Sequence, residues 1–163
     1  MMKLPLLLCL IVCNILGHAQ KLTLKSTDII LQTTFDQAIS KNVSQNEVIN
    51  GRYYRIFSFS KLPTNDEKNE MNLLGIRLLD YLPIKNYLVS IPDQFSLLQL
   101  EKYNISHVEK VPQNLKFDPV LFEMPYPDWA KDGDLIKISI LLMRDAEFEN
   151  TLNRITQKQI RVS

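Results

Sequence analysis

The chain has 163 residues, of which 45% are hydrophobic, and its 19 basic residues almost balance its 18 acidic ones. The two kinds of charge are interspersed without a lysine or arginine block, so the sequence predicts binding neither to nucleic acid nor to an anionic membrane. With only two cysteines and two histidines, the chain has little material for a disulfide framework or a histidine-rich metal centre.

The first 19 residues have the pattern of a cleavable signal peptide. A short positive start at Met1 to Lys3 precedes an apolar stretch, Leu4 to Leu16, that is too short for a good membrane span. Gly17-His18-Ala19 then places small residues three and one positions before a cut between Ala19 and Gln20. The alternative is a buried N-terminal helix. We expect export, either by secretion or to the periplasm or cell surface.

Cleavage after Ala19 would also change what chemistry the rest of the chain can perform. It removes both cysteines together with His18 and Lys3, which leaves 18 basic and 18 acidic residues. A thiolate nucleophile and a disulfide are then excluded, and a catalytic triad has only His107 to build on. We therefore predict no catalytic, cofactor-binding or metal-ligating residues and no cofactor.

Residues 20–50 are polar and weakly patterned. A short strand is expected at Asp28 to Leu31 and a helical turn at Phe35 to Ser40. We interpret the segment as a leader that is partly ordered against the next region of the chain.

Residues 51–112 carry the clearest pattern. Arg52 to Phe59 has apolar residues on both faces, which is typical of an interior strand. Thr64 and Glu67 form a capping box that begins a helix, and Gly75 ends it. Further strands are expected at Ile76 to Leu82 and Tyr87 to Ile91, separated by a turn at residues 83–86.

A second helix is expected in the same region, with Asp93 as its N-cap and Asn104 just past its end. A strand from Ile105 to Val111 follows it. The order β-α-β-β-α-β is the split β-α-β motif, so we predict an α+β fold. It consists of a ferredoxin-like antiparallel sheet with two helices on one face.

The remainder is predicted to be a linker and an incomplete second β-α-β unit. Residues 113–134 contain three prolines around Trp129, which we interpret as a packing anchor, and end in a turn at Gly133. In residues 135–163 we expect a strand from Leu135 to Met143 and a helix capped by Asp145. A last strand, at residues 159–162, would leave the unit open at the end of the sequence.

His107 is the one candidate for acid–base chemistry, because Ser106 precedes it and Glu109 lies two residues on. A triad needs members brought together by the fold, so this local cluster favours an exposed or hydrogen-bonded histidine in an edge strand. Asn42-Val43-Ser44 and Asn104-Ile105-Ser106 fit the N-glycosylation pattern, which matters only in a eukaryotic secretory pathway.

Several short motifs carry a resemblance to a known family. They are Gly51-Arg52-Tyr53-Tyr54-Arg55-Ile56, Leu62-Pro63-Thr64, Gly75-Ile76-x-Leu78-Leu79-x-Tyr81-Leu82-Pro83 and Asn86-Tyr87-Leu88. In this order they resemble the N-terminal prodomain region of secreted subtilisin-like serine peptidases, particularly those of Bacteroidota. The resemblance covers roughly residues 24–163 and is most specific from Ile76 to Leu88.

The resemblance implies a propeptide that helps its protease fold and keeps it inactive. In that family the prodomain sheet packs on the protease, and the segment after the domain enters the active-site cleft. The partner would be a subtilisin-like protease domain, in cis. The family's aspartate, histidine and serine motifs lie downstream of the prodomain, so no catalytic residue is carried over. The alternatives are a free-standing protease inhibitor and a secreted or cell-surface protein-interaction module.

Overall fold

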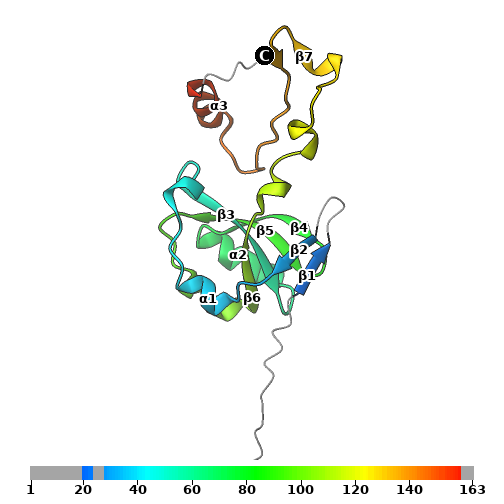
Figure 1. The fold of residues 1–163 in the computed structure, drawn as a ribbon. Helices are drawn as coiled ribbons and strands as arrows, with labels where there is room; N and C mark the ends of the chain where they lie inside the picture. The colour runs from blue at the N-terminus through cyan, green and yellow to red at the C-terminus, as the bar shows by residue number, and fades with distance from the viewer. Residues whose placement is uncertain (1–19, 24–27, 159–163) are drawn as a thin grey trace, which may run out of the picture.

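A computed structural model describes residues 20–23 and 28–158 of the chain (Figure 1). The predicted signal peptide and its last residue, Ala19, lie outside the described residues, and Gln20 is the first residue of strand β1. The last expected strand, at residues 159–162, also lies outside them.

The centre of the structure is a four-stranded antiparallel sheet in the order β4-β5-β3-β6. β3 is an interior strand, as its apolar residues on both faces predicted, and pairs with β5 and β6. This strand order is the one that a split β-α-β motif gives, and the predicted α+β class is confirmed. The strands are β3 (Arg52–Phe59), β4 (Arg77–Leu82), β5 (Asn86–Pro92) and β6 (Ile105–Lys110).

Helix α2 (Asn65–Leu73) begins and ends as the sequence predicted. The Thr64 hydroxyl accepts a hydrogen bond from the Glu67 amide at 3.2 Å, and the Glu67 carboxylate accepts one from the Thr64 amide at 2.7 Å. Gly75 has a φ of +85°, and a Cβ there would lie 3.1 Å from the Pro92 ring. A glycine is therefore needed both for the backbone conformation and for the space.

The second predicted helix is different from what we expected. It is the 3-10 helix η2 (Leu97–Tyr103), preceded by Ser96 without a side-chain cap. Asp93 does not cap it, because Asp93 lies in a turn that the Phe95 amide closes on the Pro92 carbonyl at 3.1 Å, and the element begins only after Ser96. Asn104 ends the element with a φ of +56°, the left-handed conformation expected at that position.

The segment that we interpreted as a leader belongs to the folded domain. It forms β1 (Gln20–Thr23), β2 (Asp28–Leu31), α1 (Phe35–Ile39) and the 3-10 helix η1 (Gln45–Glu47). The strand and helical turn expected there are present, but the boundary at residue 51 does not separate a domain from a peripheral leader. The reason is burial, because Leu31 and Phe35 are 1% and 6% exposed.

The core has two layers on opposite faces of the sheet. On the inner face α1, α2 and η2 pack against β3, β5 and β6 around Phe57, Met71 and Leu100. On the outer face Ile29 and Leu31 of the β1-β2 hairpin pack against Ile56. Each face of the sheet is thus covered by an element from the segment before residue 51.

Most of residues 113–158 lies beyond one end of this domain (Figure 1), although Leu115 still packs against the outer-face cluster. These residues contain less regular structure than expected. The turn at Gly133 is confirmed. The strand expected from Leu135 to Met143 is shorter and ends at Ile136, because among the described residues only β7, a strand of two residues, pairs with it. Trp129 is 78% exposed and is not a packing anchor. The elements are η3 (Gln113–Leu115), η4 (Pro119–Phe122), η5 (Asp128–Ala130), β7 (Lys131–Asp132), β8 (Leu135–Ile136) and α3 (Phe148–Gln157).

Candidate functional site

The most strongly organised polar group lies on the outer face of the sheet. Tyr54 and Arg77 both pair with Ser90, which places the three side chains on one face of three neighbouring strands. Arg52 lies on the same face and donates to the Ser90 hydroxyl at 2.6 Å and to the Gly75 carbonyl at 2.7 Å. We refer to Arg52, Tyr54 and Arg77 together as the arginine notch.

The arginine notch holds the carboxylate of Asp145, which comes from the C-terminal part of the chain. The Tyr54 hydroxyl donates to Asp145 Oδ1 at 3.1 Å, while Arg52 Nε and Arg77 Nη1 lie 3.3 and 3.5 Å from Oδ2. The Asp145 side chain is only 6% exposed. Asp145 is therefore not the helix N-cap that the sequence predicted, and Glu147 occupies that position without a side-chain bond.

The charges of the notch favour an anion between them. Burial lowers the pKa of the Arg52 guanidinium, and the nearby positive charge of Arg77 lowers it further, while the Asp145 carboxylate acts in the opposite direction. Burial, and then the charge and hydrogen bond of Asp145, raise the pKa of the Tyr54 phenol to about 12. Two guanidinium groups on one face are thus stabilised by a single carboxylate.

We expect a tyrosine NMR titration to show Tyr54 losing its proton near pH 12, and the D145N substitution to lower that pKa toward the ordinary value of 10. Because the folded chain holds this proton more tightly, the contribution of Tyr54 to stability is complete below pH 10 and is lost as the pH rises toward 12. The Y54F variant assigns the resonance. An unchanged Tyr54 pKa in D145N would contradict the hydrogen bond between Tyr54 and Asp145.

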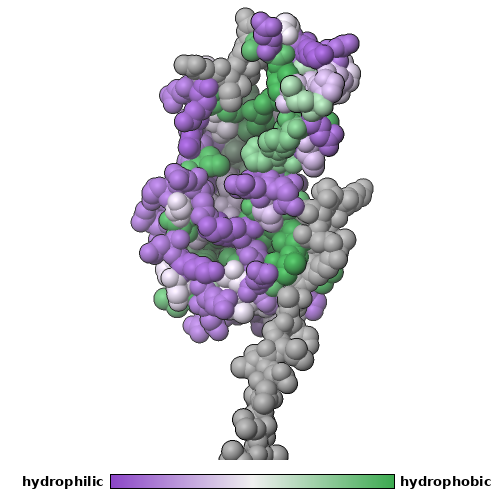
Figure 2. Space-filling view, viewed as in Figure 1, coloured by the Kyte–Doolittle hydropathy of each residue, from purple (hydrophilic) through white to green (hydrophobic). Residues whose placement is uncertain are grey.

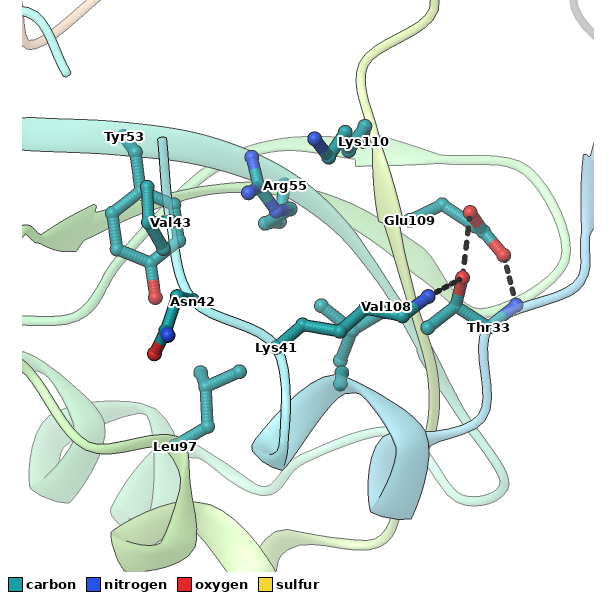
Figure 3. Close-up of a pocket in the computed structure, with 11 residues that line it drawn as sticks. Thr33, Lys41, Asn42, Val43, Tyr53, Arg55, Leu97, Val108, Glu109 and Lys110 are labelled. Carbon is teal, nitrogen blue, oxygen red and sulfur yellow. Dashed lines mark hydrogen bonds between the residues drawn. The ribbon is translucent and has the colours of Figure 1, made fainter. Parts of the chain in front are cut away.

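A second feature is a pocket of about 400 Å³ on the face of the sheet opposite the arginine notch, between α1, β3 and β6 (Figure 3). Its polar lining includes Lys41, Arg55 and Lys110. Glu47 binds two of these, with 2.7 Å to Arg55 and 2.6 Å to Lys110, and the Lys41 ammonium donates to the Thr33 hydroxyl at 3.4 Å. The cations of the pocket thus already have partners.

Glu47 remains ionised in this arrangement. Burial raises the pKa of its carboxyl, but hydrogen bonds and charge from Lys110 and Arg55 outweigh burial and leave the pKa below its ordinary value. Arg55 also lies over the Tyr53 ring, with 4.8 Å from its guanidinium carbon to the ring centroid. The pocket is therefore built around an internal ion-pair network and does not present a free charge to a ligand.

His107 is placed in the edge strand β6, as expected, but not in a triad. Its Nδ1 lies 3.2 Å from the Ser106 hydroxyl, and that hydroxyl donates to the Ser58 carbonyl at 3.0 Å. The Glu109 carboxylate accepts hydrogen bonds from the Gln32 and Thr33 amides. Glu109 thus fixes the backbone after β2 and does not orient His107.

The arginine notch was missed at the level of sequence. A signal was present, because Arg52 and Arg77 stand in strands of a sheet whose other residues are largely apolar, and a partly buried charge needs a partner. The partner could not be found, since Asp145 lies 68 residues beyond Arg77 and also fits a helix N-cap. The described residues contain no group of histidine, cysteine or acidic side chains that could hold a metal ion.

Large apolar side chains are exposed in the C-terminal part, and Figure 2 shows them gathered above the more polar domain. Phe122 is 74% exposed and Leu141 is 96% exposed. None of the helices in the described residues is long and apolar enough to cross a membrane. The exposed side chains are Phe117, Val120, Phe122, Met124, Trp129, Leu135, Ile136, Ile138, Ile140, Leu141, Leu142 and Phe148.

The folded domain and a known sequence family have nearly the same extent. Residues 21–112 match the family described as a domain of unknown function, DUF8729. The match spans more than half of the chain, so the protein belongs to this family. It includes β2, α1 and the whole four-stranded sheet, in agreement with their shared core. No curated protein and no solved structure matches the chain.

Proposed function

We propose that this chain is the prodomain-like N-terminal region of a secreted subtilisin-like serine endopeptidase and is not catalytic by itself. In this role it is exported by its signal peptide, assists folding of the protease domain in cis and inhibits it. The proposal follows the resemblance of roughly residues 24–163, most specific from Ile76 to Leu88, to such prodomains, and the α+β fold is compatible with it.

The observation that carries the proposal is the exposed apolar surface of residues 117–142. Large contiguous apolar patches are rare on isolated soluble domains and mark surfaces that contact another protein. In the family that the sequence resembles, the segment directly after the domain enters the protease cleft. Here the segment in that position exposes Phe122, Trp129 and Leu141 by 74, 78 and 96%.

One observation favours a second candidate, a secreted or cell-surface interaction module without a protease. A prodomain of the resembled kind packs its sheet on the protease. In this chain the outer face already carries Ile29 and Leu31 of the β1-β2 hairpin and the carboxylate of Asp145. A partner would therefore bind mainly to the segment after the domain, which an interaction module also allows.

Inhibition measurements distinguish the two candidates. We expect purified residues 20–163 to inhibit subtilisin in a stoichiometric titration that is followed with a chromogenic peptide substrate. The L141D substitution introduces a charge at a position that is 96% exposed, and should weaken inhibition by about tenfold or more. L73D is the matched control, because Leu73 is 86% exposed on α2 outside this segment.

Two results would count against the protease role. One is an absence of inhibition together with a reading frame that encodes no subtilisin-like domain beyond Ser163. The other is equal weakening of inhibition by L141D and L73D, which would mean that the exposed apolar segment is not the contact. If the reading frame encodes a protease domain but the purified chain does not inhibit subtilisin, the remaining role is folding assistance in cis. That role is measured as the yield of active protease with and without residues 20–163.

A further inference from the structure

The contacts of Asp145 have a meaning that does not depend on the proposed function. We propose that the arginine notch is a carboxylate-binding site and that Asp145 is its tethered ligand. The chain beyond Leu115, residues 116–158, is then held to the domain by a polar latch at this point. The site would accept the carboxylate of another aspartate or glutamate side chain when Asp145 is removed.

The geometry of the notch is that of a receptor for one carboxylate. Both oxygens of Asp145 are engaged, one by the Tyr54 hydroxyl at 3.1 Å and the other by the two guanidinium groups at 3.3 and 3.5 Å. Arg52 is held in place independently of Asp145, because it also donates to Ser90 and to the Gly75 carbonyl. A site with oriented donors loses little conformational freedom when it binds a carboxylate.

The latch has a second, more exposed contact beside it. Arg144 forms an ion pair with Asp80 of β4 at 2.5 Å, with side chains that are 72 and 42% exposed. Exposed pairs of this kind contribute little, whereas a charge that is almost fully buried depends strongly on its partners. Asp145, with 6% exposure, is therefore the residue whose loss should release the C-terminal part.

Because Asp145 is part of the same chain, a carboxylate in solution should not compete with it for the arginine notch in the native protein. A ligand on the same chain acts at an effective concentration in the millimolar range or above. A small carboxylate in solution binds a two-arginine site weakly and would not displace Asp145 at moderate concentration. Removing the Asp145 carboxylate should expose the site to such a probe.

The first test is the rotational motion of the C-terminal helix. In the native protein, ¹⁵N relaxation should give the amides of α3 and β3 one common correlation time. In D145A the amides of α3 should show a clearly shorter correlation time than those of β3. This corresponds to a shift of about tenfold or more in the equilibrium between the C-terminal part bound to the domain and released from it. D128A is the matched control, since Asp128 is a fully exposed carboxylate of the same C-terminal part that pairs only with Lys131 among the contacts described.

The second test is binding of sodium formate, with sodium chloride at equal ionic strength as the control. In D145A, formate should shift the Arg52 Nε–Hε NMR signal in a saturable manner. The native protein and the R77A/D145A double variant should show no such shift. D145N, which keeps the size of the side chain, replaces D145A if the latter fails to fold.

Each test can overturn the proposal. If α3 and β3 keep a common correlation time in folded D145A and D145N, Asp145 is not a latch. If formate shifts the Arg52 signal equally in the native protein and in D145A, or in neither, the notch is not a carboxylate site that Asp145 occupies.

Discussion

Replacement of Leu31 by alanine should lower the free energy of unfolding by about 2–5 kcal/mol, the usual cost of truncating a buried leucine. Leu31 is 1% exposed and packs on the outer face of the sheet with Ile29 and Ile56. A cavity on this face cannot collapse easily, because β2 is fixed at its end by hydrogen bonds from the Gln32 and Thr33 amides to Glu109. Urea unfolding followed by circular dichroism measures the change.

The neighbouring residue provides the control. Ile30 is 55% exposed on the same strand, so the I30A substitution should change stability by less than about 1 kcal/mol. If L31A and I30A had equal small effects, residues 20–50 would not contribute to the core of the domain. A chain that begins at Gly51 should then also unfold cooperatively, whereas we expect it to lose its cooperative transition.

Replacement of Met71 by alanine should likewise lower the free energy of unfolding by about 2–5 kcal/mol. Met71 is fully buried on the inner face of α2, where the core cluster also contains Phe57 and Leu100. The effect should arise from a lost core contact and not from helix propensity, because alanine favours helix at least as well as methionine does. The midpoint of urea unfolding should fall while its slope stays constant.

Leu73 gives the matched control for Met71 within one helix. Its side chain is 86% exposed, so L73A should stay within about 0.5 kcal/mol of the native protein. A larger effect of L73A than of M71A would mean that α2 presents a different face to the sheet. The two variants together test the orientation of the helix and not merely its existence.

The elements that could be predicted from the sequence are those whose signals are local. The capping box at Thr64, the glycine at the end of α2 and the two-faced apolar pattern of β3 each depend on a few neighbouring residues. The left-handed Asn104 belongs to the same group. Each was found because its physical cause, a cap, a positive φ or a buried strand, leaves a specific residue type at a specific position.

The elements that could not be predicted depend on contacts between distant residues. The hairpin strand at Asp28–Leu31 appeared as a short isolated strand, and only its packing on Ile56 makes it part of the core. Asp93 and Asp145 are both good N-cap residues, but the first lies in a turn that the Phe95 amide closes on the Pro92 carbonyl, and the second is bound by the arginine notch. For Asp145 a tertiary contact replaced the local preference of an aspartate for the N-cap, whereas for Asp93 a local turn did so.

Glu109, near the end of the domain's sequence, is hydrogen-bonded to residues near its beginning. These contacts can form only after nearly the whole domain has been synthesised. The Glu109 carboxylate accepts hydrogen bonds from the Gln32 and Thr33 amides, which lie 77 and 76 residues earlier. A chain that is synthesised from its N-terminus therefore produces β2 long before the residue that fixes it. Closing so long a loop costs conformational entropy before any contact compensates, which slows folding. Ile29 and Leu31 can contact Ile56 earlier, but Val111 and Leu115, which also pack on their cluster, are made late as well. This hairpin therefore stays partly uncovered and open to aggregation while the chain is being made.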